Sequence, residues 1–172
     1  MREWRYTSRE DWKIISGYPM KAVLQRVVNA CVTVDGVEKG RIKFGLLVYL
    51  GVAHDDCEGD AEKLSEKIAY LRIFDDADGK MNLSLKDIAP SNPGCGVLAV
   101  SQFTLLADAR KGRRPSWNRA APPEKAKKLY EYFIEKIKEQ NLPCESGEFQ
   151  AHMMVSYTND GPVTILLDSK GG

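Results

Sequence analysis

This chain has few histidines, which limits the catalytic mechanisms and metal sites that it can contain. The 172 residues include only two histidines, His54 and His152, and no H-x-x-x-H pair. Zinc-activated water and a serine-histidine-aspartate triad are therefore both poorly supported. His54 lies in an acidic stretch and His152 in a predicted strand, so both are interpreted as structural or solvated residues. No metal site is predicted from them.

The acidic stretch at residues 75–79 also fails as a metal site. Aligning Gly79 with the turn glycine of a calcium loop puts Phe74 at the first ligand position and Leu85 at the position of the bidentate glutamate. Calcium binding is rejected for this reason. The stretch is predicted to form a tight acidic turn.

Paired cysteines, long apolar runs and a strong net charge are also missing. The four cysteines show no C-x-x-C spacing, which argues against a zinc knuckle or a disulfide framework. No apolar run approaches the roughly 20 residues of a membrane span, and residues 1–13 lack the apolar middle of a secretory signal. We therefore expect a cytoplasmic protein with reduced thiols. Because the net charge is only +1, any RNA contact has to come from a local patch.

The apolar pattern predicts a single α+β domain. With 43% hydrophobic residues, a chain of this length has room for a core. Asp35-Gly36 is a strong hairpin signal between two β-rich runs. Helical spacing predicts a helix that Asp60 caps and that ends near Phe74, and Pro122-Pro123 opens a second main helix. The predicted strands of a mostly antiparallel or mixed sheet cover residues 22–34, 37–42, 44–52, 97–100, 149–158 and 163–167.

A glycine–proline pair interrupts the last apolar runs. It lies in the sequence Asn-Asp-Gly-Pro-Val-Thr at residues 159–164. Gly161 can adopt unusual backbone angles, and Pro162 fixes its own. A cis bond before proline costs only about 0.5–1 kcal/mol over trans, so the pair can form a rigid elbow that presents carbonyl oxygens in a fixed direction. An ordinary hairpin turn is the alternative interpretation.

The sequence Ser-Gln-Phe-Thr-Leu at residues 101–105 is the second unusual stretch. It follows a β-branched run, which predicts a strand end where polar side chains and backbone N–H groups face a pocket. Strand alternation would place Ser101 and Phe103 on one side, and Gln102 and Thr104 on the other. Ser101 and Thr104 are candidate nucleophiles, but no base is evident for either. This pattern favours an already activated ester held against backbone N–H donors.

The densest basic patch follows directly and contains Trp117. No acidic residue occurs between residues 109 and 123. The patch is either a solvated loop or a surface that contacts phosphates with an aromatic ring beside it. The candidates for contact with a phosphate backbone are Arg110, Lys111, Arg113 and Arg114.

Together, the two unusual stretches resemble, without a gap, the signature motifs of the D-aminoacyl-tRNA deacylases, also called D-tyrosyl-tRNA deacylases. The resemblance extends from about Met20 to Asp168. Residues 1–19 are interpreted as an N-terminal extension and residues 20–172 as the deacylase domain. The resemblance implies the α+β fold of that family, whose sheet is barrel-like in the dimer.

The activity that the resemblance implies needs no metal and no cofactor. Such enzymes hydrolyse the ester of D-aminoacyl-tRNA, and of mischarged glycyl-tRNA, with help from the 2′-OH of the terminal ribose. The Gly-cis-Pro elbow of one subunit enters the partner's pocket and holds the α-ammonium group, so that an L side chain has no room. A homodimer with a cross-subunit active site is therefore expected, and the acceptor end of the tRNA is its partner.

Roles carried over by resemblance fall on two groups of residues. The catalytic strand end comprises Ser101, Gln102, Phe103 and Thr104, with the Phe103 N–H as the oxyanion donor. The substrate-binding group comprises Asn159, Gly161, Pro162, Val163 and Thr164, with Arg26 and Met153 bracing the elbow. Three alternatives stay open: Thr104 as a covalent nucleophile, an unrelated esterase that uses Thr104, and a non-catalytic RNA-binding module that uses the basic patch.

Overall fold

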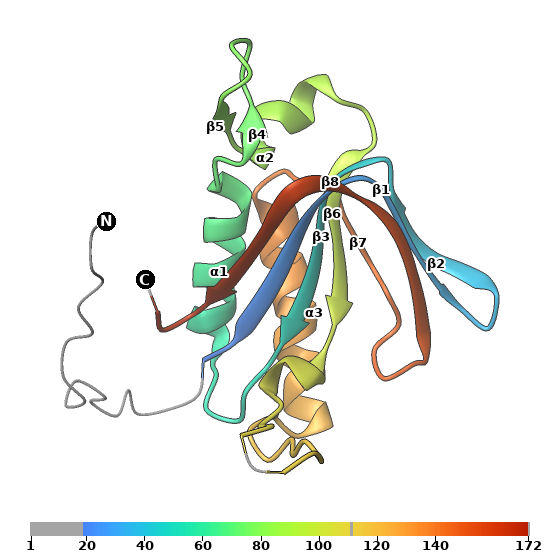
Figure 1. Cartoon of the computed structure of the whole chain (residues 1–172), viewed down its shortest axis with the longest axis vertical. Helices are drawn as coiled ribbons and strands as arrows, with labels where there is room; N and C mark the ends of the chain where they lie inside the picture. The colour runs from blue at the N-terminus through green and yellow to red at the C-terminus, as the bar shows by residue number, and fades with distance from the viewer. Residues whose placement is uncertain (1–18, 111, 172) are drawn as a thin grey trace, which may run out of the picture.

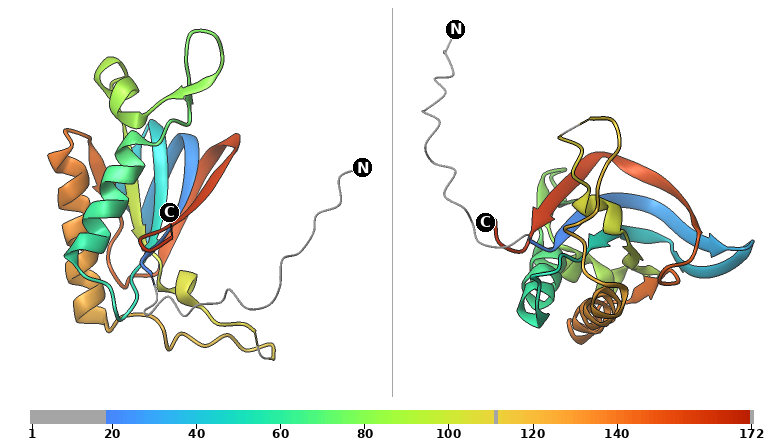
Figure 2. Two further views of the ribbon diagram at one scale, coloured as in Figure 1. Left: turned by 90° about the vertical axis from the view of Figure 1, so that its left-hand side faces the viewer. Right: turned by 90° about the horizontal axis from the view of Figure 1, so that it is seen from below.

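A six-stranded mixed sheet forms the centre of the molecule, and two long helices cover one of its faces (Figures 1 and 2). The computed structural model describes residues 19–110 and 112–171. The sheet contains β1 (Lys21–Val34), β2 (Val37–Ile42), β3 (Phe44–Gly51), β6 (Cys95–Ser101), β7 (Cys144–Ser146) and β8 (Met153–Asp168). The remaining elements are α1 (Glu58–Tyr70), β4 (Phe74–Asp75), β5 (Met81–Leu83), α2 (Leu85–Ile88), η1 (Ala89–Ser91), η2 (Phe103–Leu106) and α3 (Pro123–Glu139). The predicted α+β class is confirmed.

Strand β1 organises the sheet because three other strands pair with it. One edge pairs with β8 along almost the whole length of β1, and the other pairs first with β3 and then with β2, all antiparallel. β3 and β6 are parallel, as are β6 and β7. Register shifts interrupt the pairing of β1 with both β2 and β8, and such bulges bend a strand. The result is a strongly curved, barrel-like sheet (Figure 2).

The continuous apolar run in β3 is explained by burial on both faces. Leu46, Val48 and Leu50 belong to the core between the sheet and the helices, whereas Leu47 belongs to a second cluster on the opposite face. β6 divides its side chains in the same way. Strands buried on two sides lose the polar alternation of a half-exposed strand.

The first hairpin has the predicted turn. Asp35 and Gly36 connect β1 to β2 with φ values of 50° and 78°. Positive φ at both central residues is the geometry of a type I′ turn, whose twist matches that of the strands. The acidic stretch at residues 75–79 likewise connects β4 to β5, with Gly79 at φ 72°.

Both main helices are present, with corrections to the first. α1 starts at Glu58 after the N-cap Cys57, and Asp60 stabilises that start from the third helical position, where its carboxylate accepts the Cys57 N–H at 2.8 Å. The helix ends at Tyr70 rather than near Phe74, which lies in β4. Within the described residues, no helix has the length and apolar character needed to cross a membrane.

The two predicted C-terminal strands form one strand. β8 runs through the Asn-Asp-Gly-Pro stretch, so this stretch is not the turn of a hairpin. The predicted strand at residues 149–158 also starts later than expected, at Met153. Residues 101–105 differ as well, because β6 ends at Ser101 and a 3₁₀ turn follows from Phe103. The expected side-to-side alternation from Ser101 to Leu105 is therefore wrong.

Candidate active site

A pocket of about 570 Å³ opens where β6 ends. Volumes of a few hundred Å³ are typical of sites for small ligands or for one end of a larger one. Ser101, Gln102 and Phe103 line one side. The remaining lining residues come from the end of β3, the start of α3 and the chain before β8, and include Val52, Ala121, Pro123, Phe149, His152 and Met153. The predicted strand end therefore does face a pocket.

The backbone at Phe103 is arranged to donate a hydrogen bond. Phe103 is the first residue of η2, and the first N–H groups of a helix have no acceptor within it. The preceding Gln102 does not cap them, since its side-chain amide donates to the hydroxyl of Thr104 instead. Gln102 is itself fixed, because its N–H donates to the Leu50 carbonyl at 2.8 Å.

α3 holds the end of β6 in place through a buried tyrosine. The Tyr130 hydroxyl donates to the Ala99 carbonyl at 2.9 Å, two residues before Ser101. Burial raises the pKa of this phenol, so it stays a neutral donor. This contact fixes the lip of the pocket against the helix that forms its opposite wall.

A bulge in β8 forms the Gly-Pro elbow. Gln25 and Val27 are two residues apart on β1, whereas their partners on β8, Thr164 and Asn159, are five residues apart. Between these two pairs, β8 therefore has three more residues than β1, and they bulge out of the sheet. The Gly161–Pro162 peptide bond within this bulge is cis.

Arg26 of β1 fixes the elbow through polar contacts. Its guanidinium is buried, with Nη1 donating to the Ile73 carbonyl at 2.6 Å and Nε lying 2.8 Å from the Asp160 carboxylate. The Arg26 carbonyl accepts from the Asn159 amide at 2.8 Å, and that amide also donates to the Val163 carbonyl at 3.2 Å. Arg26 thus fixes one end of the bulge, at Asn159 and Asp160, and the Asn159 amide joins that end to Val163 at the other.

Gly161 itself faces open space. A methyl group built on its Cα would meet only the Asn159 side-chain oxygen, at 3.8 Å, which is an ordinary contact. The described fold therefore leaves room for a larger residue at this position. A reason for glycine has to be sought outside the subunit.

The elbow and the pocket lie far apart within one chain. Arg26, beside the elbow, pairs with Leu46, whereas Ser101 pairs with Leu50, four residues farther along β3. Four residues along a strand and three strand spacings across the sheet amount to about 13 Å and about 14 Å, or roughly 20 Å in all. Neither Gly161 nor Pro162 lines the pocket. The two motifs therefore do not form one site in a single subunit.

The predicted braces of the elbow separate in the same way. Arg26 contacts the elbow of its own chain, whereas Met153 lines the pocket. Phe149 and His152 also line the pocket, although the sequence predicted no functional role for either. The only sequence signal near them is the predicted turn at Ser146-Gly147. The residues between that turn and Met153 form the loop that carries Phe149 and His152.

The basic loop after η2 lies beside the pocket. Trp117 packs edge-on against Phe103, with 5.9 Å between ring centroids, and both rings are exposed. Asp108 pairs with Arg110 and Arg119 at 2.6 and 3.0 Å, and the Arg110 guanidinium holds the pKa of that carboxyl well below its usual range. Arg113 and Arg114 are exposed, and Lys111 lies outside the described residues.

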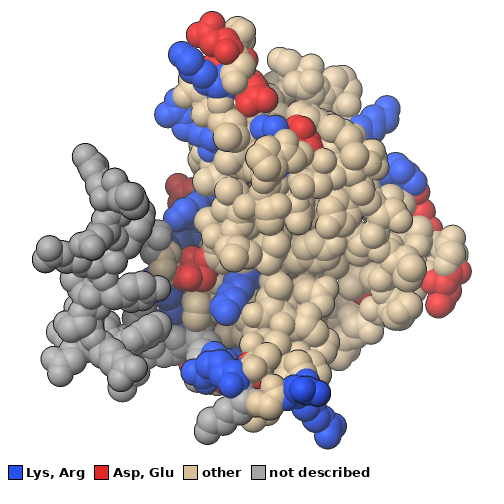
Figure 3. Space-filling model, in the orientation of Figure 1, with Lys and Arg blue, Asp and Glu red and all other residues tan. Residues whose placement is uncertain are grey.

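The sheet face away from the helices carries almost no charge. Figure 3 shows few Lys, Arg, Asp or Glu side chains over the centre of this face, where β8 crosses the view. Leu166 and Tyr157 of β8 are 75% and 38% exposed. An uncharged face with exposed apolar side chains is typical of a protein–protein interface.

Comparisons with known proteins agree with the motifs. The family model described as D-Tyr-tRNA(Tyr) deacylase matches residues 23–168. The chain is 60% identical over 151 residues to the D-aminoacyl-tRNA deacylase of Koribacter versatilis (strain Ellin345), and 61% identical over 152 residues to that of Thermosipho melanesiensis (strain DSM 12029 / CIP 104789 / BI429). Each match covers 88% of this chain and 98% of the relative.

Solved structures share the fold. One described as c-Myc DNA Unwinding Element Binding Protein has a TM-score of 0.77 at 39% identity, over 86% of this chain and 97% of that one. A probable eukaryotic D-amino acid tRNA deacylase has a TM-score of 0.73 over 88% of this chain and 100% of its own, and at 18% identity it supports the fold alone. From the match of the family model and the identity to these relatives, the chain belongs to the D-aminoacyl-tRNA deacylase family.

Proposed function

We propose that this protein hydrolyses the ester bond of D-aminoacyl-tRNA, and of mischarged glycyl-tRNA, in the pocket at the end of β6. The observation that carries the proposal is the uncapped Phe103 N–H beside Ser101 and Gln102 in that pocket. A fixed N–H donor stabilises the oxyanion that forms when water attacks the ester carbonyl. The 2′-OH of the terminal ribose assists that water, so no side-chain base is needed.

The Gly161–Pro162 elbow acts as the chirality filter of a partner subunit's pocket. Its carbonyl oxygens hold the α-ammonium group of the substrate, and the space left beside it accepts the side chain of a D residue but not of an L residue. Three observations support this role: the elbow is fixed by Arg26, Gly161 faces open space, and the elbow lies too far from its own pocket. The uncharged sheet face over β8 provides the surface on which two subunits pair.

The exposed arginines of the basic loop contact the tRNA backbone. Arg113 and Arg114 lie in the loop that carries Trp117, whose ring packs against Phe103 at the edge of the pocket. Positive side chains near an ester-binding pocket bind phosphates of the acceptor end. Thr104 does not itself line the pocket, and it acts by positioning Gln102, whose side-chain amide donates to the Thr104 hydroxyl.

The reaction is tested by measuring amino-acid release from D-Tyr-tRNA and L-Tyr-tRNA side by side, with EDTA present. We expect rapid cleavage of the D ester only, because the filter excludes the L side chain and no metal takes part. Cleavage of both esters at similar rates would contradict the filter. Cleavage of neither, together with salt-sensitive tRNA binding, would favour a non-catalytic RNA-binding module.

The cross-subunit arrangement is tested by mixing two impaired variants, Phe103→Pro and Gly161→Ala. In a mixed dimer, one site has both defects, and the other combines an intact Phe103 N–H with an intact elbow. Random exchange of subunits should therefore restore about a quarter of the wild-type activity. If elbow and pocket acted within one chain, every site would remain defective and the mixture would show only the mean activity of the two variants.

A further inference from the structure

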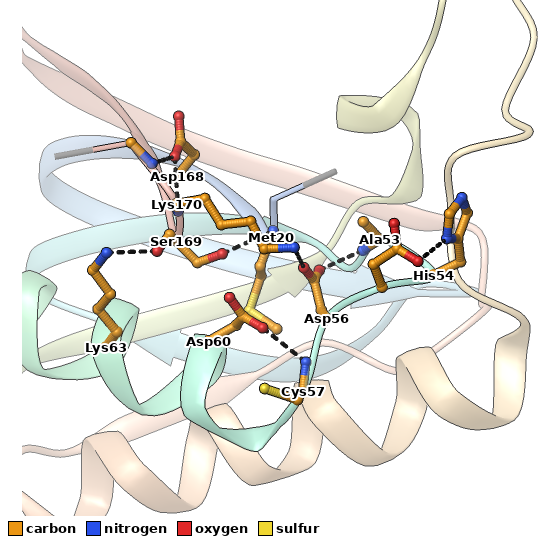
Figure 4. A network of polar contacts seen from close by, with 12 residues as sticks. Met20, Ala53, His54, Asp56, Cys57, Asp60, Lys63, Asp168, Ser169 and Lys170 are labelled. Atoms are coloured by element: carbon orange, nitrogen blue, oxygen red, sulfur yellow. Dashed lines mark hydrogen bonds and ion pairs between the residues drawn. The ribbon is translucent and has the colours of Figure 1, made fainter. Parts of the chain in front are cut away.

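A buried carboxylate far from the pocket has an unsatisfied oxygen. Asp56, between β3 and α1, is 1% exposed. Its Oδ2 accepts the Ala53 N–H at 2.6 Å, whereas Oδ1 has no hydrogen-bond partner within the described part of the chain. The ammonium group of Lys170 lies 3.9 Å from Oδ1, too far for a hydrogen bond. Figure 4 shows this cluster.

The backbone nitrogen of Met20 faces this carboxylate. Met20 is fully buried, and its N–H donates to the Ser169 hydroxyl at 3.2 Å, while its carbonyl accepts the Ser169 N–H at 3.0 Å. Burial raises the pKa of Asp56 to about 6, and the nearby Met20 N–H acts in the opposite direction. One amide hydrogen thus faces two acceptors, and the carboxylate is left incompletely satisfied.

Lys170 is the cation nearest to Asp56 among the described residues, and it does not reach hydrogen-bond distance. Asp60 adds a second carboxylate, whose charge raises the pKa of Asp56 further, and Lys170 is the cation that lowers it. The Lys63 ammonium donates to the Ser169 carbonyl at 2.6 Å and is not among the groups that shift the pKa of Asp56. A positive charge at the Met20 nitrogen would pair with Asp56. A protonated amine also has three hydrogens to donate, whereas a peptide nitrogen has one.

We propose that this cluster is a binding site for the α-ammonium group of Met20, so that Met20 is the functional amino terminus of the protein. One hydrogen of the amine stays on the Ser169 hydroxyl, and a second reaches Asp56 Oδ1. The family match begins at Val23, so the residues before Met20 lie outside the part of the chain that the family model matches. Because the relatives are matched over 98% of their length by 88% of this chain, a chain starting at Met20 is expected to fold by itself.

The test compares three proteins by thermal unfolding at pH 7: the full chain, residues 20–172, and residues 20–172 preceded by Gly-Ser. The last has a free amine displaced from the site. We expect the chain starting at Met20 to have an unfolding constant about tenfold lower than the other two. In Asp56→Asn versions of all three, the difference should disappear. Mass spectrometry confirms that Met20 carries a free amine.

Titration of that amine by NMR provides a second measurement. Pairing with Asp56 should raise its pKa about one unit above the ordinary range of about 7.7–8.0. A raised folded-state pKa means that the added stability is complete below about pH 7.7, as long as Asp56 is ionised, and is lost as the pH rises through about 9. It is lost again in acid, where Asp56 is protonated. Equal stabilities of the free and displaced amines, or an ordinary pKa, would overturn the proposal. Neither measurement depends on deacylase activity.

Discussion

Replacement of Phe103 by proline is expected to lower kcat for D-Tyr-tRNA hydrolysis by about 10²–10³-fold, which is the usual loss when one oxyanion donor is removed. Proline has no N–H, but it fits the first position of a helical turn, because that N–H has no partner within the turn. The preceding Gln102, at φ −143° and ψ 81°, is already outside the helical region that proline disfavours before it. The fold should therefore survive, as circular dichroism would verify.

The matched control is Phe103→Ala. It removes the same ring, and with it the contact to Trp117, but keeps the N–H. We expect Phe103→Ala mainly to raise KM, because the ring lies at the pocket edge and not at the reacting carbonyl. Equal losses of kcat in both variants would assign the effect to the ring and contradict the oxyanion role of the backbone.

Local sequence signals predicted those parts of the fold that local physics determines. Asp35-Gly36 predicts the turn because a type I′ turn requires positive φ at both central residues, and few residue types other than aspartate, asparagine and glycine tolerate it. Pro122-Pro123 opens α3 because proline suits a first turn, and the stripe of Leu129, Phe133 and Ile137 is buried as its spacing requires. The motifs at residues 101–105 and 159–164 were found for a different reason, namely resemblance to a family.

The features of the fold that the sequence did not predict depend on contacts between residues far apart in the chain. The hydrogen bond from Asn159 to the Arg26 carbonyl joins positions 133 apart, and no periodicity in either segment indicates it. The pairing of β8 with β1 converts two predicted strands into one bulged strand. Likewise, β6 ends at Ser101 because η2 starts at Phe103. A four-residue turn is too short to produce a recognisable hydrophobic periodicity in the sequence. The walls contributed by Phe149 and His152 follow from the closure of the whole sheet.

Substitution of Gly161 by alanine is expected to lower kcat/KM for D-Tyr-tRNA at least tenfold, without a change in the free energy of unfolding. The physical reason is the direction of the new methyl group. It meets nothing closer than 3.8 Å within its own chain, so it must project toward whatever the elbow contacts. If that is the α-carbon and amine of the substrate in the partner's pocket, both binding and D/L discrimination depend on the absence of a side chain there. Rates with D-Tyr-tRNA and L-Tyr-tRNA and urea unfolding measure the two effects.

Gly59 offers the matched control. A methyl group on it would also meet only one atom, the Cys57 sulfur, at 3.8 Å, and it lies in α1, away from both motifs. Gly59→Ala should therefore leave discrimination unchanged, and it should leave stability unchanged or raise it by up to about 1 kcal/mol, because alanine favours a helix over glycine. An unchanged D/L ratio in Gly161→Ala would remove the elbow from the filter, even if Phe103→Pro were inactive, because the two variants test separate steps. The N–H at Phe103 acts on the oxyanion of either enantiomer, so only the elbow can account for a difference between them.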